Sequence, residues 1–232
     1  MKDYLSDISQ KSAARVAGVN YLVVIILGIF ANMIVRMTFF VPDDPTATVE
    51  NITDNEFLFR LSFVCDLIMS MCWLFVGVAL YLVYKEVNKN ISLLMVLSFL
   101  AGVPIMMLNL IFHYGALLLL SDEYYSTIFT SDQLNALVML FLNLHEQGYI
   151  IATLFTSFCL LPFGYLSLKS GYFPTVLSTL LIIGPTLAII DHFMVLLFQT
   201  PFELTMLMTI PLVIAEFSTC GWLLLKGVKI PE

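Results

Sequence analysis

The sequence predicts an all-α membrane protein, a polytopic transmembrane bundle of about six helices with its N- and C-termini on the cytoplasmic side. Three observations lead to this class: the composition, the length of the apolar stretches and the placement of the basic residues. Of the 232 residues, 60% are hydrophobic and 12% are charged, whereas soluble domains are about half apolar and about a quarter charged. With a mean hydropathy of +0.96, the chain suits lipid better than water.

The apolar stretches have the length of membrane-spanning helices. About 20 apolar residues cross the hydrocarbon core as a helix, and a helix pairs all the backbone groups that lipid would leave unsatisfied. The first stretch is too long for a cleaved signal peptide, and no Ala-x-Ala-type cleavage site closes it. We expect a single integral membrane domain, residues 1–232, with spans at about 16–40, 57–84, 91–120, 134–167, 174–198 and 204–226.

The charged residues predict the orientation. Loop 41–56 carries five acids and no base, and loop 121–133 carries three acids and no base. Eight of the ten basic residues lie at the opposite ends of the spans: Lys2, Lys11, Arg15, Lys85, Lys89, Lys169, Lys226 and Lys229. The positive-inside rule places that side in the cytoplasm. We therefore expect a multi-pass protein of the plasma membrane, the inner membrane of a bacterium. Its surroundings are the lipid bilayer, and no basic footprint indicates nucleic acid as a partner.

Ionisable residues inside the predicted spans are the most informative feature for function. A charge at the bilayer centre costs at least ~2.5–3.5 kcal/mol on insertion scales, so each one needs a reason. Counted at ~1.5 Å per residue from the predicted ends of the spans, they fall at mid-depth or in the outer half, where the two remaining bases, Arg36 and Arg60, also lie. The candidate ligand-binding residues are Arg60, Asp66, His113, His145, Glu146, Asp191, His192 and Glu216.

Two hypotheses explain this set without a catalytic metal. In the structural hypothesis, salt bridges and hydrogen bonds join the helices, with Arg60 paired to Asp66, Asp191 or Glu216. The protein then has a structural or partner-binding role and no small-molecule site. In the hypothesis that the sequence favours, the residues form an outward-facing acidic and histidine site that binds or transports a cation or small polar ligand. The reason is charge, because carboxylates without cations must be protonated, bind a cation or face water.

A third hypothesis is a metal-dependent intramembrane hydrolase. Imidazole and carboxylate groups suit Zn²⁺ or Fe²⁺, and an open coordination position would allow hydrolysis of a lipid-borne bond. A divalent metal such as zinc would be the cofactor, and no serine lies in a nucleophile motif. Self-association into a homo-oligomer is compatible with every hypothesis. The candidate metal ligands are His113, His145, His192, Asp191 and Glu216, with Asp66 as a further acid.

Several short motifs, spread in order over nearly the whole chain, are similar to one family. They resemble the bacterial polytopic membrane proteins catalogued as domain of unknown function 4386. The resemblance implies a six-span fold and no known chemistry. The motifs are Lys11–Gly18 with Tyr21 and Leu22, the segment from Asn51 to Arg60, Leu80 with Tyr81, Lys169–Pro174, Ala215 with Glu216, and Leu225–Val228.

Overall fold

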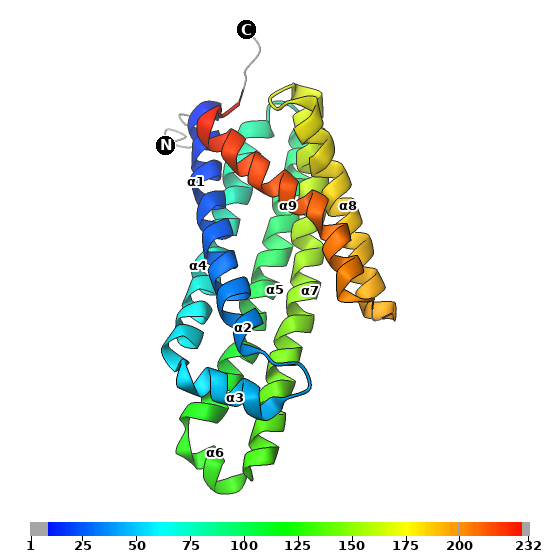
Figure 1. Ribbon diagram of the computed structural model, residues 1–232. Helices are drawn as coiled ribbons and strands as arrows, with labels where there is room; N and C mark the ends of the chain where they lie inside the picture. Colours follow the sequence, from blue (N-terminus) through cyan, green and yellow to red (C-terminus); the bar gives the residue numbers. More distant parts are fainter. Residues whose placement is uncertain (1–8, 199, 229–232) are drawn as a thin grey trace. The chain divides into compact units, whose positions relative to one another are not determined.

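The computed structural model describes residues 9–198 and 200–228, which are helical throughout apart from short connections (Figure 1). Lys2 and Lys229, two of the bases that predict the orientation, lie outside the described residues. The element η1 is a stretch of π-helix that continues directly from α1 and into α2. In chain order the elements are α1 (Gln10–Gly28), η1 (Ile29–Arg36), α2 (Met37–Phe39), α3 (Pro45–Asp54), α4 (Glu56–Tyr84), α5 (Lys89–Ser121), α6 (Glu123–Ile128), α7 (Ser131–Ser170), α8 (Thr175–Phe198) and α9 (Phe202–Leu225).

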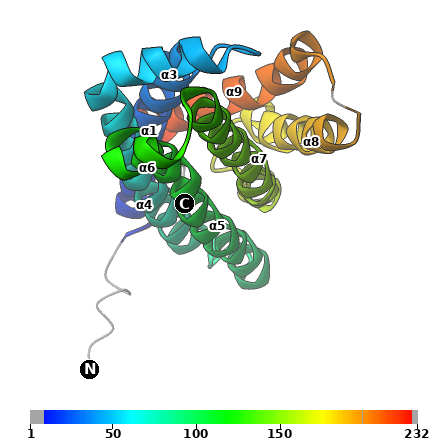
Figure 2. The same ribbon diagram turned by 90° about the horizontal axis from the view of Figure 1, so that it is seen from below.

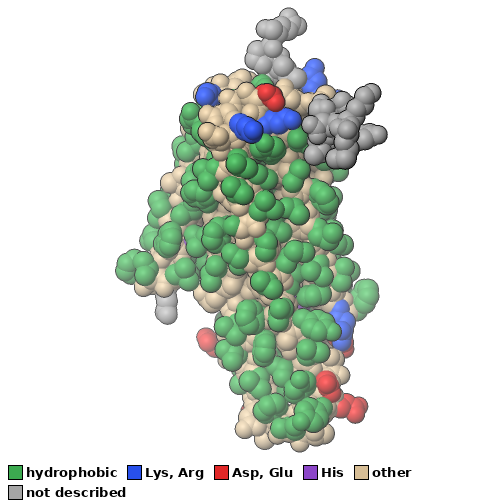
Figure 3. Space-filling model, turned by 180° about the vertical axis from the view of Figure 1, so that it is seen from behind, with side chains coloured by type: hydrophobic (Ala, Val, Ile, Leu, Met, Phe, Trp, Pro, Cys, Tyr) green, Lys and Arg blue, Asp and Glu red, His purple; other side chains and the backbone are tan. Residues whose placement is uncertain are grey.

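Six helical segments of the described chain are long and apolar enough to cross a membrane. They match the six predicted spans in order, so the prediction of an all-α polytopic bundle is confirmed and the protein is a multi-pass membrane protein. The first segment begins ahead of its apolar stretch because Ala13 and Ala14 favour helix and are buried. Hydrophobic side chains cover most of the face drawn in Figure 3, as a lipid-facing surface requires. The segments are Gln10–Phe39, Glu56–Tyr84, Lys89–Ser121, Ser131–Ser170, Thr175–Phe198 and Phe202–Leu225.

Contacts between residues divide the chain into two compact units, each of which is described by itself. Unit 1 consists of Met1–Val23, Cys72–Val103 and Ala152–Glu232, and unit 2 consists of Val24–Met71 and Pro104–Ile151. The long helices α4, α5 and α7 each contribute one stretch to either unit. The expectation of a single domain stays a prediction.

In unit 1, polar and aromatic contacts join the ends of four helices. The hydroxyls of Tyr84 and Ser167 lie 2.7 Å apart, and the Gln10 amide of α1 donates to the Val83 carbonyl of α4 over 2.9 Å. The Tyr84 and Tyr172 rings have centroids 5.6 Å apart. The start of α1 therefore lies beside the ends of α4 and α7 and the turn that precedes α8. Lys11, Lys85 and Lys169 lie near these same helix ends.

In unit 2, α3 and α6 carry the acidic loops and lie at the same end (Figure 1, Figure 2). The Asp44 carboxylate caps α3 by accepting from the Ala47 amide over 2.9 Å, and Pro45 follows in the first turn, where its missing N–H costs nothing. The Asn51 amide donates to the Phe39 carbonyl over 3.2 Å, which ties α3 to the end of α2. Phe39, Ile52 and Phe59 join a core contributed by α2–α5 and α7. This core closes one end of the site described next.

Candidate metal centre

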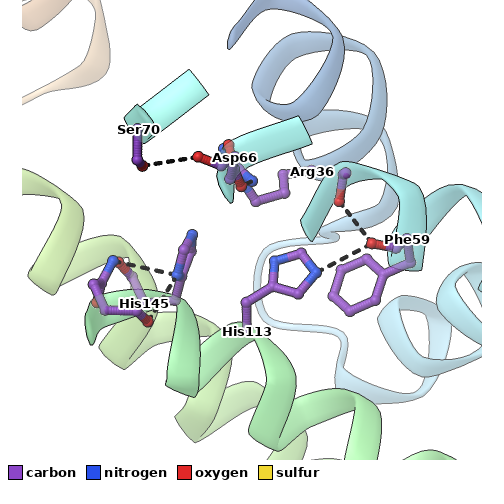
Figure 4. A network of polar contacts seen from close by, with 8 residues as sticks. Arg36, Phe59, Asp66, Ser70, His113 and His145 are labelled. Atoms are coloured by element: carbon purple, nitrogen blue, oxygen red, sulfur yellow. Dashed lines mark hydrogen bonds and ion pairs between the residues drawn. The ribbon is translucent and has the colours of Figure 1, made fainter. Parts of the chain in front are cut away.

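Three ionisable side chains from three helices converge in unit 2: Asp66 of α4, His113 of α5 and His145 of α7 (Figure 4). One ligand atom from each residue lies within 4.8 Å of the other two. Their exposed fractions are 2%, 0% and 4%, so the group is shielded from solvent and lipid. The two imidazole rings meet edge to face with centroids 5.5 Å apart. Within the described part of the chain, this is the one group of three such residues with metal-ligand spacing.

Each histidine uses one ring nitrogen for a backbone contact and leaves the other without a partner. His113 Nε2 lies 3.2 Å from the Phe59 carbonyl oxygen, and His145 Nδ1 lies 3.3 Å from the Asn109 carbonyl oxygen. The Phe59 carbonyl only accepts, so we assign the His113 ring proton to Nε2. His145 Nδ1 lies between the Asn109 carbonyl and the Asn109 side-chain nitrogen, a donor 3.2 Å away, and we assign its proton to Nδ1, the tautomer that leaves Nε2 able to bind a metal. His113 Nδ1 and His145 Nε2 then keep lone pairs, and both are buried with no hydrogen-bond partner among the described residues.

Packing around the histidines fixes both rings. The Phe59 ring stacks on His113 with centroids 4.1 Å apart and an interplanar angle of 18°. The Asn109 side-chain amide donates to the His145 carbonyl over 2.8 Å. Gly148, one turn farther along α7, makes room for Asn109, because a Cβ there would lie 1.9 Å from Asn109 Oδ1. The lone pairs of the two rings therefore have fixed directions.

Asp66 is paired with Arg36, the last residue of η1. The two Arg36 Nη atoms face the two carboxylate oxygens, Nη1 in direct contact with Oδ2 and Nη2 3.5 Å from Oδ1. The π-helix contributes to this placement, since the Met37 amide reaches back five residues to the Asn32 carbonyl. One residue more per hydrogen-bonded turn changes the direction of every following side chain. The sequence identified Arg36 only as an outer-end base, and its periodicity carries no signal for this shift.

The expectation that Arg60 pairs with Asp66 is wrong. The Arg60 Nε donates to Glu56 Oε1 over 2.6 Å, and both side chains are nearly half exposed. Residues four apart on a helix are neighbours, whereas residues six apart, such as Arg60 and Asp66, point ~120° apart around the axis. Arg60 therefore binds its neighbour on the helix surface and Arg36 supplies the cation that the buried acid needs.

The other predicted residues, Asp191, His192 and Glu216, belong to unit 1. His192 has contacts at both ring nitrogens: Nε2 lies 2.7 Å from Thr153 Oγ1, and Nδ1 contacts the Ala188 carbonyl of its own helix. Asp191 is 2% exposed, and Glu216 is half-buried beside the Tyr21 hydroxyl. The group in unit 2 contains two of the five predicted metal ligands, His113 and His145. Its third member is Asp66, which the sequence predicts as a further acid. Ligand binding by any of these residues stays a prediction.

A cavity of about 250 Å³ lies beside the group, between η1, α2, α3, α4 and α7. Its polar lining consists of Asn32, Arg36, His145, Glu146 and Tyr149, and the rest of its wall is apolar. Glu146, one of the predicted residues, is exposed, whereas its neighbour His145 is buried, because adjacent helical residues point in different directions. Glu146, Arg36 and His145 therefore line the same cavity. Glu146 and His145 were predicted as site residues, and Arg36 was not.

The fold and the site define a multi-pass membrane protein with a buried aspartate and histidine cluster. The model of the family described as Domain of unknown function (DUF4386) matches residues 16–227. The chain belongs to this family, as the motifs in its sequence suggest. No curated protein and no solved structure matches the chain.

Proposed function

We propose that Asp66, His113 and His145 bind one divalent transition metal ion, Zn²⁺ in the first instance, and that the protein is a metal-dependent hydrolase within the membrane. The observation that carries the proposal is the pair of buried nitrogens, His113 Nδ1 and His145 Nε2, that have no hydrogen-bond partner in the described part of the chain. Buried polar atoms are normally satisfied, and each exception requires an explanation. Histidines that bind metals commonly donate their other N–H to a backbone carbonyl, as both rings do here.

The donor set fits a catalytic zinc site. Two imidazoles and one carboxylate leave the fourth position of a tetrahedron open for water, as in zinc hydrolases. Ligands at 2.0–2.2 Å from one ion stand roughly 3.4 Å apart, so atoms within 4.8 Å of one another need to approach by up to about 1.4 Å when the ion binds.

The neighbouring charges suit hydrolysis of an ester or amide. A metal held by the three residues would lower the pKa of a coordinated water and so supply the nucleophile. The water oxygen would add to the carbonyl carbon as the carbonyl π bond opens to an oxyanion. Collapse of the oxyanion would break the C–O or C–N bond to the leaving group, which would receive the proton of the water. Arg36, already at the carboxylate of Asp66, would stabilise the oxyanion. Glu146, on the cavity wall, would carry the proton.

The test is elemental analysis of the purified protein with matched histidine variants. We expect one zinc ion per chain, and its loss in His113→Ala and in His145→Ala. The control is His192→Ala, because this third histidine is already bonded at both nitrogens and its removal should leave the metal content unchanged. Wild-type protein without stoichiometric metal, or an equal loss in all three variants, would refute the proposal.

A second candidate function is binding or transport of a cation or small polar ligand. Two observations favour it: Arg36 neutralises Asp66 without any metal, and Glu146 adds an exposed carboxylate to the cavity. Without metal, the cavity would then carry one net negative charge and attract a cation. Metal-free protein that binds an organic cation, and loses this binding in Glu146→Gln, would favour this function over the hydrolase.

The orientation is a further proposal, with cytoplasmic termini in the plasma membrane. It is supported by lysines at one end of unit 1 and acidic loops at one end of unit 2. A cysteine replacing Thr127, which is exposed in α6, should react with an impermeant reagent in intact cells, and one replacing Lys169 should not. The opposite pattern of labelling would reverse the orientation.

A further inference from the structure

We propose that the cavity beside the metal centre binds the acyl end of a membrane lipid, with its carbonyl or carboxylate at the metal and its hydrocarbon chain against the apolar wall. This names the substrate class as long-chain acyl esters or amides that enter from the bilayer. The inference rests on the proposed metal centre and concerns what that centre acts on.

The lining of the cavity has a polar part and an apolar part, which match the head group and the chain of an amphiphile. Arg36 and His145 connect it to the metal cluster, and the apolar part includes Phe39, Ile52 and Ile150. Ligand sites are commonly apolar, with a few polar groups that fix the orientation of the bound molecule. The volume of about 250 Å³ is below the ~300–1,000 Å³ of pockets that enclose a drug-sized ligand. The cavity therefore suits a head group and the first part of a chain, with the remainder outside.

The mouth of the cavity lies among lipid-facing side chains. Met37 lines the cavity and is 54% exposed. On the same helical segment, Met33 and Ile34 are 59% and 57% exposed. Large apolar side chains exposed on membrane-spanning helices face hydrocarbon rather than water. A lipid chain can therefore leave the cavity beside Met37 directly into the bilayer.

Charge selects the head group. Arg36, Asp66 and Glu146 together carry one net negative charge, and a divalent ion changes this to one net positive charge. Net charge within a membrane is costly, so one carboxylate or oxyanion at the metal makes the loaded site neutral. An acyl chain ending in a carboxylate should therefore bind the metal-loaded protein and not the metal-free protein.

The experiment measures binding of radiolabelled palmitate to the purified full-length chain in detergent, with the zinc content determined in the same samples. We expect saturable binding of one palmitate per zinc, at least tenfold weaker after the metal is removed by a chelator. Acetate at the same concentration should not compete, because the apolar wall has no contact with it.

Two pairs of variants separate the cavity from the metal. Ile150→Trp fills the cavity, whereas Ile151→Trp changes the next residue of α7, which is 46% exposed and lies outside the lining. Met37→Trp at the mouth and Met33→Trp one turn earlier form the second pair. Ile150→Trp and Met37→Trp should retain zinc and bind palmitate at least tenfold more weakly, and each control should bind it like the wild type.

The outcomes distinguish this inference from the proposed function. Protein that holds zinc but binds no palmitate, or binds it equally well in all four variants, refutes the lipid site and leaves the metal centre standing. Protein that holds no zinc refutes both. If Ile150→Trp fails to fold, the Met37→Trp and Met33→Trp pair decides the result by itself.

Discussion

The two units of the chain both place a histidine and an aspartate on their membrane-spanning helices, yet they use them differently. In unit 1, His192 has contacts at both ring nitrogens, one from Thr153 and one from its own helix. In unit 2, His113 and His145 each leave one ring nitrogen without a hydrogen-bond partner among the described residues, and one nitrogen of each ring lies within 4.8 Å of the same carboxylate. A histidine on a membrane-spanning helix is thus not by itself a sign of a ligand site. What distinguishes the group in unit 2 is that two histidines and one carboxylate converge.

The two arginines near the outer ends of the spans also differ in how they are used, because one is in a buried ion pair and the other in an exposed one. Arg36 lies beside Asp66, with side chains 14% and 3% exposed, whereas Arg60 and Glu56 are 43% and 48% exposed. A buried pair loses much when one partner is removed, since the other charge stays buried. An exposed pair contributes little. The predictions below use these contrasts, beginning with the largest expected effect.

Replacing Arg36 should cost the most stability. In metal-free protein, Arg36→Ala leaves the Asp66 carboxylate buried without a cation, and we expect a loss of about 3–5 kcal/mol in the free energy of unfolding. Arg60→Ala, the control, should change it by less than ~1 kcal/mol. Unfolding in detergent measures both. Saturating zinc should reduce the effect of Arg36→Ala, because the ion then compensates Asp66. Equal effects of the two substitutions would show that Arg36 reaches the head groups instead.

Gly148→Ala should weaken metal binding without removing a ligand. The new Cβ would lie 1.9 Å from Asn109 Oδ1, so Asn109 must move and His145 loses the group that orients it. Changes of this kind commonly reduce metal affinity roughly 10–100-fold. The control is Gly221→Ala on α9, where the added Cβ has no atom of another described element within 4 Å. Zinc titration with a competing chelator measures both, and wild-type affinity in Gly148→Ala would exclude a role for Asn109 in holding the site.

His192→Ala should have the smallest effect. It removes the contact with Thr153, and the net contribution of one such hydrogen bond is about 0.5–1.5 kcal/mol. We expect a small decrease in thermal stability, with unchanged zinc content and palmitate binding. A loss of zinc in this variant would place His192 in the metal centre and remove the distinction between the two units.

The six spans were predictable because the bilayer fixes their length and composition. Depth along the predicted spans also placed Asp66, His113 and His145 in a common zone. The direction of each side chain was not predictable: the partner of Asp66 depends on the π-helical turns of η1, which no periodicity in the sequence reveals. His192 likewise has the same side chain as the two cluster histidines, and only its contacts with Thr153 and Ala188 distinguish it.

The central claim, that His113, His145 and Asp66 hold one metal ion, is tested most directly by X-ray absorption spectroscopy of the zinc-loaded protein. The geometry of the group predicts two imidazole nitrogens and additional oxygen ligands, at about 2.0–2.2 Å from the ion. His145→Ala should remove this zinc signal. A spectrum with sulfur ligands, or one unchanged in His145→Ala, would contradict the claim.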